Sequence, residues 1–410
     1  MGCPADTFPG LFFYFIHMAV SSTGKIIIAG DFFPIPENQQ AFCDGNIELL
    51  LGEKLCGLFS NADLAVCNLE GALTDHDERC MKTGPVKVAS SRAVEAFRKM
   101  GIRCCMLANN HATDGGHQGL LDTMNALQQA GIHYIGAGKD QFSIDKSVIN
   151  EVGGMKVAFY NVSETMYNKP TENLSGAWLY DEYVVCHDIE VLRKECDYLV
   201  VIYHGGIEKF PYPSPETRKR FHRMADSGAD MVLSQHTHCI GSEENYNGSY
   251  LLYGQGDFLL KNFKPGLTDT GLLVELAIQD GRVEVRKHKV ESVDNKYVRY
   301  AANQDLSDFM QRSSRIEDEE FVDSEFRRFC KGELRLYLTA FKSPGRMRQR
   351  FRRFFPSAFK RWLFSDAFSD RDLLFTLHTL RSEQNRETAI VGIEDLLGER
   401  KSKKALERKK

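Results

Sequence analysis

A short apolar run that ends in a metal-ligand type of side chain occurs five times along the chain. The runs are rich in β-branched residues and are bounded by glycine or polar residues, which predicts buried β-strands. Ligands of open α/β sheets bind at the carboxyl ends of the strands, so the side chains after the runs are expected to converge there. The runs and the residues that follow them are 26–29 with Asp31, 64–67 with Glu70, 102–108 with Asn109, Asn110 and His111, 198–203 with His204, and 231–234 with His236 and His238.

Helical patterns separate several of these strands. They occupy residues 91–100, 114–130 and 214–227, and the last has Ser214 as a cap with Pro215 in its first turn. Strands that alternate with helices indicate a layered α/β domain.

Two further segments, residues 149–158 and 273–287, predict β-hairpins, the second through the turn pair Asp280-Gly281. A sheet that combines hairpins with helical connections is mixed. No G-x-G-x-x-G follows any strand, which disfavours a dinucleotide-binding fold. We therefore expect an α/β fold of the mixed-sheet αββα sandwich type.

The size of the chain leaves room for a second region. With 410 residues, 42% of them hydrophobic, it can bury one large core and form a smaller unit besides. The net charge of −4 argues against chain-wide binding of polyanions, and we expect no nucleic acid partner. Eleven cysteines without a C-x-x-C pair indicate neither a disulfide framework nor a thiolate zinc site, so a reducing cytosol fits best.

The two ends of the chain differ from its middle. Residues 11–20 resemble the apolar centre of a signal peptide, but no basic residue precedes them and the run is too short to span a bilayer. Residues 1–23 are therefore expected to be an apolar extension, packed on the domain or not native, with a membrane-touching leader as the alternative.

From residue 305 the pattern predicts a helical region that reaches 398, including a helix over 371–381. Within it, residues 334–365 carry nine basic side chains, eight aromatic ones and no acidic one. This mixture suits an anionic membrane surface or a polyanionic polymer, and equally a helix that packs its rings on a core. Residues 399–410 are expected to form a disordered or fraying basic tail.

The six candidate ligands are oxygen and nitrogen donors without a thiolate. Such a set suits one or two divalent ions, Mn²⁺, Zn²⁺ or Fe²⁺. On a strand the rings of His236 and His238 would point to opposite faces, so their convergence requires a loop, which Gly241 permits. The candidate ligands are Asp31, Glu70, Asn110, His204, His236 and His238.

In their order along the chain these motifs resemble the bacterial capsule-synthesis protein CapA family, which is associated with poly-γ-glutamate capsules and has a fold like the calcineurin-type metallophosphoesterases. The resemblance covers about residues 25–290, within a domain expected at 24–292. The motifs are Gly30-Asp31, Asn68-Leu69-Glu70-Gly71, Asn109-Asn110-His111 with Asp114 to Gly116 after it, His204-Gly205-Gly206 with Glu208, Gln235-His236-Thr237-His238, and Tyr253-Gly254-Gln255-Gly256-Asp257-Phe258.

The resemblance implies that the six candidate ligands hold the metal and that His111 protonates a leaving group. Asn109 and Asp257 would contact substrate. Two departures stand out. Metallophosphoesterases usually have Asp-x-His in the first motif, whereas Phe32 and Phe33 follow Asp31, and the family's usual Gly-Asn-Phe is here Gly256-Asp257-Phe258.

The expected function is a metal-dependent hydrolase of a phosphoester or γ-glutamyl bond in the synthesis of an anionic cell-envelope polymer. The polymer or its precursor would be the partner. The protein is expected in the cytoplasm or peripherally at the inner face of the membrane. The alternative is a non-catalytic accessory protein that binds a polymer or a membrane synthase through a degenerate metal site, which the missing first-motif His favours and the presence of His111 opposes.

Overall fold

The computed structural model describes residues 23–80, 82, 84–165, 169–260, 268–340 and 370–407. The chain forms two compact units, one made almost entirely of residues up to Glu317 and the other mainly of residues 318–410. The predicted apolar extension up to residue 22 and the basic segment from 341 to 365 lie outside the described residues. Across the described part of the chain, no helix has the length and apolarity that a membrane crossing needs.

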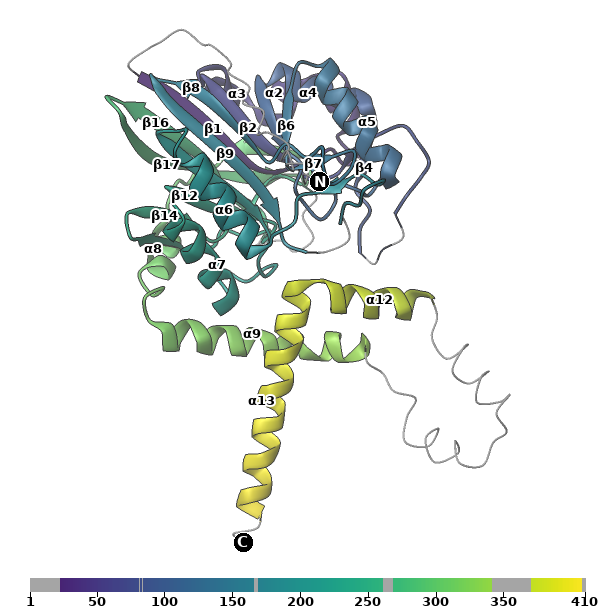
Figure 1. Ribbon diagram of the computed structural model, residues 1–410, viewed down its shortest axis with the longest axis vertical. Helices are drawn as coiled ribbons and strands as arrows, with labels where there is room; N and C mark the ends of the chain where they lie inside the picture. Colours follow the sequence, from purple (N-terminus) through teal and green to yellow (C-terminus); the bar gives the residue numbers. More distant parts are fainter. Residues whose placement is uncertain are drawn as a thin grey trace, which may run out of the picture. The chain divides into compact units, whose positions relative to one another are not determined.

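The first unit contains two large mixed sheets (Figure 1). In the first sheet the strand order is β18-β17-β16-β1-β2-β5-β6, with β15 pairing β1 at its end. Its strands are β1 (Thr23–Phe32), β2 (Leu64–Leu69), β5 (Ile102–Met106), β6 (His133–Ile135), β15 (Asp257–Leu259), β16 (Thr270–Gln279), β17 (Arg282–Val293) and β18 (Tyr297–Tyr300).

The second sheet has the order β13-β14-β12-β11-β9-β8. Its strands are β8 (Ser147–Val152), β9 (Met155–Ser163), β11 (Tyr198–His204), β12 (Met231–Gln235), β13 (Glu243–Tyr246) and β14 (Ser249–Leu252). Two small ladders join β3 (Ala72–Leu73) to β4 (Val88–Ala89) and β7 (Ala137–Gly138) to β10 (Gly176–Ala177).

Side chains that alternate along the strands build three apolar layers. Ile26 and Ile28 of β1 pack between the two sheets, whereas Ile27 faces the other way, into a core shared with helices. In β11, Val200 faces the space between the sheets and Val201 faces the outer core. Successive strand residues point to opposite faces, so a strand buried on both sides reads as a continuous apolar run.

Helices cover the outer face of each sheet, with α4 and α5 beside the first and α6 and α7 beside the second (Figure 1). The predicted αββα sandwich is therefore confirmed. The helices of this unit are α1 (Gln39–Cys43), α2 (Ile47–Leu51), α3 (Glu53–Ser60), η1 (Ser91–Ala93), α4 (Val94–Lys99), α5 (Gly116–Gln129), α6 (Glu182–Leu192), α7 (Pro215–Asp226) and α8 (Ser307–Ser313).

Local chemistry fixes several of these elements as the sequence predicts. The Ser214 side chain accepts a hydrogen bond from the Thr217 backbone N–H and so caps α7, whose first residue is Pro215. Both predicted hairpins form as antiparallel pairs, β8 with β9 and β16 with β17. Asp280 and Gly281, at the second turn, have φ of 51° and 73°, the values that a type I′ turn requires.

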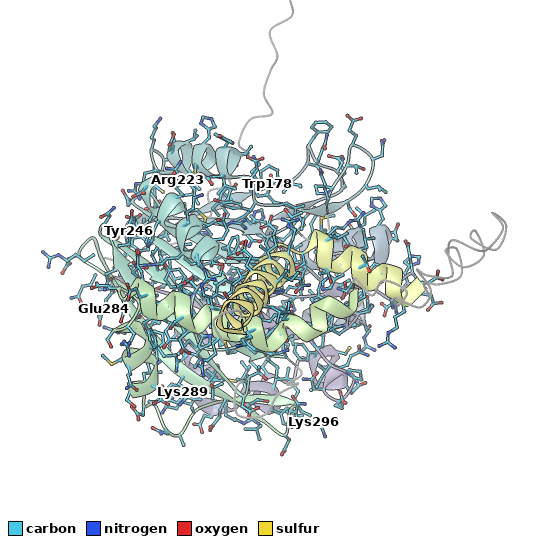
Figure 2. All side chains as sticks on the ribbon, turned by 90° about the horizontal axis from the view of Figure 1, so that it is seen from below. Trp178, Arg223, Tyr246, Glu284, Lys289 and Lys296 are labelled. Carbon is cyan, nitrogen blue, oxygen red and sulfur yellow. The ribbon has the colours of Figure 1, made fainter. Side chains whose placement is uncertain are left out.

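Aromatic side chains mark the edge of the layer outside the second sheet. Trp178 and Tyr246, both labelled in Figure 2, are half-buried against its core. The Lys146 ammonium lies 4.0 Å from the ring centroid of Trp178, and the Tyr246 ring stacks on His222 at 3.7 Å. Aromatic rings therefore cover the edge of this layer, and each ring also contacts a polar side chain.

The first unit extends beyond the boundary suggested by the sequence. A helical region was expected from residue 305, but α8 belongs to the first unit, because Phe309 is 2% exposed and packs into the core between the sheets. The separate helical unit therefore starts after Glu317.

The second unit consists of α9 (Glu319–Ala340), α12 (Asp370–Arg381) and α13 (Glu383–Glu407), which confirms a helical C-terminal region. Gly392 lets α13 approach α9 closely, since a Cβ there would lie 2.9 Å from Cys330 O. The basic tail expected from residue 399 is helical up to Glu407, where α13 ends, and its fraying stays a prediction. Its Lys, Glu, Ala and Leu residues are good helix formers, which explains the continuation.

Candidate metal centre

The carboxyl ends of the central strands bring the predicted residues together in the first unit. Asp31, at the end of β1, pairs in register with Asn68 of β2 and with Asp257 of β15. His204 ends β11 beside Gln235, the last residue of β12. The two sheets therefore present their ligand-type residues at one edge of the sandwich.

Close backbone approach makes the Asp257 position possible. A Cβ on Gly30 would lie 2.7 Å from Gly256 O, so only glycine lets β15 run this close to β1. Gly256 itself has φ of 72°. The Asp257 carboxylate is thereby brought to Asp31 and His238, and the three form a group whose ligand atoms all lie within 4.8 Å of one another.

The six predicted metal ligands converge. His204 Nε2 lies 3.0 Å from Asn110 Oδ1 and 3.9 Å from Glu70 Oε1. Asp31 is 3.7 Å from His204 Nδ1 through Oδ1 and 3.8 Å from His238 Nδ1 through Oδ2. A second group within 4.8 Å joins Glu70, His236 and His238.

The His-x-His motif lies in a loop, as its convergence demands. Strand β12 ends at Gln235, and His236 and His238 have φ of 92° and 54°. Residues other than glycine rarely adopt such angles, and the strain is maintained by surrounding contacts, as is common at functional sites. One of these contacts is a hydrogen bond of 2.9 Å from the His236 backbone N–H to Asp31 Oδ2.

His111 faces the same cluster. Its Nδ1 lies 2.6 Å from Asp114 Oδ2, and its Nε2 lies 3.7 Å from Glu70 Oε1. The Asp114 carboxylate therefore orients the ring and leaves Nε2 directed at the candidate ligands.

Two asparagines hold the ligands in place. Asn68 Nδ2 lies 2.7 Å from Asp31 Oδ1 and 3.1 Å from His204 Nδ1. Asn109 Nδ2 donates to Asn68 Oδ1, and Asn109 Oδ1 accepts from the backbone of His111. Asn109 is 0% exposed, so these contacts position its neighbours, and its predicted contact with substrate stays a prediction.

Three further charged residues at the site were not predicted. Glu164 and Glu208 each place a carboxylate oxygen near His236 Nε2, at 3.9 and 3.8 Å, and Lys87 Nζ lies 2.7 Å from Glu70 Oε2. Glu164 follows β9 just as the predicted ligands follow their strands, and Glu208 stands in the His204 motif, so both had a sequence signal. Lys87 had none, because it precedes a strand of two residues.

Negative charge exceeds positive charge at this edge. Burial, and next the Glu70 carboxylate, raise the pKa of Asp31 to about 7. Burial, and next His236, lower the pKa of His204 well below its ordinary value. Burial works against a charged His238, but the Asp257 carboxylate outweighs it and raises the pKa of His238 to about 10. The carboxylates of the cluster, called the acid cluster below, are those of Asp31, Glu70, Asp114, Glu164, Glu208 and Asp257.

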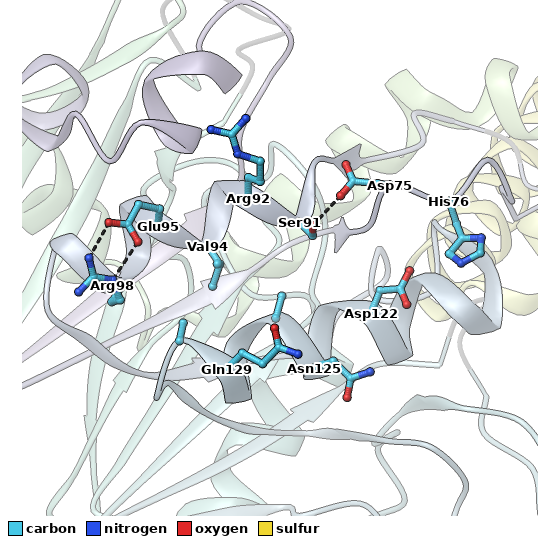
Figure 3. Close-up of a pocket in the computed structure, with 12 residues that line it drawn as sticks. Asp75, His76, Ser91, Arg92, Val94, Glu95, Arg98, Asp122, Asn125 and Gln129 are labelled. Atoms are coloured by element: carbon cyan, nitrogen blue, oxygen red, sulfur yellow. Dashed lines mark hydrogen bonds and ion pairs between the residues drawn. The ribbon is translucent and has the colours of Figure 1, made fainter.

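A groove of about 790 Å³ lies beside α4 and α5 and contains none of the predicted ligands (Figure 3). Four of its polar side chains form two pairs: Asp75 accepts a hydrogen bond from Ser91, and Arg98 pairs with Glu95. It therefore adds nothing to the candidate centre.

Comparison with known proteins gives a consistent set of similarities. The family model described as bacterial capsule synthesis protein PGA_cap matches residues 25–262. The chain is 27% identical over 231 residues to capsule biosynthesis protein CapA of Bacillus anthracis, covering 54% of this chain and 56% of that protein. It is 31% identical over 226 residues to a probable polyglutamine synthesis accessory protein of Mycobacterium tuberculosis, covering 50% and 58%.

The chain thus spans little more than half the length of these curated relatives. Among solved structures, a hypothetical protein from Thermus thermophilus aligns with 15% identity and a TM-score of 0.42, over 66% of this chain and 100% of that one.

Proposed function

The chain belongs to the bacterial capsule synthesis protein (PGA_cap) family, and we propose that it is a metal-dependent hydrolase acting on an anionic cell-envelope polymer or its precursor. The names of its relatives, which refer to capsule and polyglutamine synthesis, support the polymer. The observation that carries the hydrolase is the convergence of the predicted ligands around a proton donor, His111.

The donor set fits one or two divalent ions. Two ligands bound at 2.0–2.2 Å to one ion lie roughly 3 to 4 Å apart. The separations of 3.9 Å between His204 Nε2 and Glu70 Oε1 and of 3.8 Å between His238 Nδ1 and Asp31 Oδ2 fall in that range. Carboxylate oxygens, an amide oxygen and imidazoles suit Mn²⁺, Zn²⁺ or Fe²⁺. A buried cluster with more acids than cations also favours cation binding. The ligands would be Asp31, Glu70, Asn110, His204, His236 and His238.

The metal would supply an activated water and neutralise charge on the attacked phosphoryl or carbonyl group. His111 would donate a proton from Nε2 to the departing oxygen or nitrogen. Asp114, hydrogen-bonded to Nδ1, stabilises the protonated ring and fixes its direction. Asn68 and Asn109 hold Asp31, His204 and the His111 backbone in register.

The second candidate is a non-catalytic accessory protein that binds the polymer or a membrane synthase. Phe33 stands where the first motif usually has its metal-binding His, and a phenyl ring offers no ligand atom; the mycobacterial relative is named an accessory protein. The side chains around His111 oppose this reading, because a site that only binds has no need of an oriented proton donor.

The test is metal analysis of the purified protein, followed by assays with phosphoesters and γ-glutamyl peptides. His111→Asn should keep its metal and lose roughly 10²- to 10⁴-fold in turnover, the usual contribution of acid–base assistance. His288→Asn is the matched control, since His288 also bonds a carboxylate, Glu275, at 2.9 Å but lies elsewhere on β17. Loss of metal in His111→Asn would make it a ligand, and absence of hydrolysis by the metal-loaded chain would favour the accessory protein.

A further inference from the structure

Lys87 places an ammonium group inside the acid cluster. Its Nζ lies 2.7 Å from Glu70 Oε2, its side chain is 12% exposed, and the Glu70 side chain is 0% exposed. A lysine at this depth is held by its partner and is not a solvated surface charge.

The backbone of Lys87 is fixed from two sides. Its carbonyl accepts a hydrogen bond of 3.0 Å from the Ala72 N–H, and its own N–H donates to Asp114 Oδ2 at 2.6 Å. Asp114 is the residue that orients His111. The position of the ammonium is therefore coupled to both the candidate ligand Glu70 and the candidate proton donor.

The pair with Glu70 conflicts with metal binding. If a divalent ion binds Glu70, that ion and the Lys87 ammonium share one carboxylate. The two cations then repel each other at close range. Lys87 can keep its charge inside the cluster if an anionic group comes to lie between it and the metal. Lysine binds phosphate and carboxylate oxygens as a compact point charge, which suits this place.

We propose that Lys87 holds an anionic oxygen of the substrate, from a phosphoryl or a carboxylate group, beside the metal position. This inference rests on the proposed function and adds to it a specificity-determining residue and a substrate class. A lysine that merely compensates buried acids would bind no such group.

The test uses the full chain stripped of metal by a chelator and then titrated calorimetrically, first with Mn²⁺ and afterwards with inorganic phosphate or, separately, with glutarate. The variants are Lys87→Met and the matched control Lys25→Met. Lys25 also pairs with a buried carboxylate of the first sheet, since its Nζ lies 3.8 Å from Glu275, which is 3% exposed. Lys25 precedes the apolar run of β1 and Asp31 follows it, so its loss should leave the centre unchanged.

Lys87→Met should bind Mn²⁺ at least as tightly as the wild type, because a competing cation is gone. It should bind the preferred anion at least about tenfold more weakly, the loss expected for one charged hydrogen bond. Lys25→Met should match the wild type in both titrations. The probe that binds the wild type more tightly assigns the substrate to phosphoesters or to carboxylate-bearing chains.

Equal anion affinity in Lys87→Met and wild type would overturn the inference, as would weaker Mn²⁺ binding by a folded Lys87→Met. If Lys87→Met does not fold, Lys87→Gln, which keeps a polar contact to Glu70, is measured in its place. Absence of Mn²⁺ binding by the wild type would refute the metal in the proposed function. Phosphate and glutarate titrations of the metal-free wild type and Lys87→Met would then test the role of Lys87 by itself. Equal anion affinities of the two proteins would again overturn the inference.

Discussion

Two buried glutamates of the first unit lie in opposite electrostatic settings. Glu244 of β13 is 7% exposed and accepts hydrogen bonds from Arg218 at 2.8 Å, from the Tyr253 hydroxyl at 2.7 Å and from His222 at 3.1 Å. Glu70, which is 0% exposed, has the Lys87 ion pair, while in the described part of the chain neither of its oxygens accepts a hydrogen bond.

On the proposed function, the difference separates an acid that stabilises the fold from one that binds a metal. Burial raises the pKa of Glu244, but hydrogen bonds from Arg218, Tyr253 and His222 outweigh it and lower that pKa below its ordinary value. Around Glu70 lie the Lys87 ammonium and the imidazoles of His111 and His204. Its carboxylate is also close enough to Asp31 to help burial raise the pKa of Asp31. A satisfied network stabilises the native state, whereas an excess of buried carboxylates favours the binding of a cation.

The largest effect on the free energy of unfolding is expected from removing the hydrogen-bonded carboxylate of Glu244. Glu244→Ala leaves Arg218 partly buried without its carboxylate and should lower the free energy of unfolding by about 3–5 kcal/mol. In metal-free protein Glu70→Ala should cost less, because the Glu208 carboxylate, which the Lys87 charge also stabilises, remains. Urea denaturation with a chelator present measures both, and equal losses would remove the distinction between the two settings.

Mn²⁺ should stabilise the folded protein through Glu70, and this stabilisation should not depend on Glu244. A ligand that binds only the native state adds about 2.7 kcal/mol at 100 times its Kd and about 4.1 kcal/mol at 1,000 times. We expect this increment on adding Mn²⁺ to the wild type and to Glu244→Ala, and its absence in Glu70→Ala. Thermal denaturation with and without Mn²⁺ measures it; an increment retained in Glu70→Ala would contradict the assignment of Glu70 as a ligand.

The strand-end residues were predictable because each signal is local. An apolar run followed by Asp31, Glu70, Asn110, His204 or His236 can be recognised without knowing the rest of the fold, and the rule that strands present ligands at their carboxyl ends brings the runs together. The cap of α7 and the Asp280-Gly281 turn of the β16–β17 hairpin are local in the same sense.

Other features depend on contacts between distant segments. Lys87 meets Glu70 only because β3 and β4 form a two-residue ladder, and a ladder that short leaves no periodic pattern in the sequence. Phe309 assigns α8 to the first unit through burial between two sheets, which the composition of residues 305–317 does not show. The role of Asn109 as a support for Asn68 likewise required the register of β2 and β5.

The pH dependence of the stability of the metal-free protein should report the electrostatics around Glu70 and Asp31. With the pKa of Asp31 raised from 3.8 to about 7, the folded chain keeps a proton that the unfolded chain has released, so this group's contribution to stability falls as pH rises between those values. One unit of pKa corresponds to about 1.4 kcal/mol, which puts the total on the order of a few kcal/mol.

Asp31→Asn cannot release that proton, so its stability should fall less steeply with pH than that of the wild type over this window, whatever its absolute stability. Denaturation at a series of pH values in chelator measures the two slopes. Saturating Mn²⁺ should abolish the decline in the wild type, because the ion favours the charged carboxylate. Parallel slopes in wild type and Asp31→Asn would show that Asp31 is not the group responsible.

The smallest effect on stability is expected from a change beside Glu244. It tests whether the hydrogen-bond network of Glu244 is independent of the proposed metal centre. Helix α7 carries Arg218 and His222, two hydrogen-bonding partners of Glu244, and Ser214 caps its first turn. Ser214→Ala should cost about 1 kcal/mol, within the range of 0.5–2 kcal/mol for a lost N-cap, in urea denaturation with or without metal. Because α7 lies on the outer face of the second sheet, the increment in stability from Mn²⁺ should be the same in Ser214→Ala and wild type. A reduced increment would mean that the network around Glu244 helps to position His204 and His236 across the sheet, and the two settings would then be one coupled system.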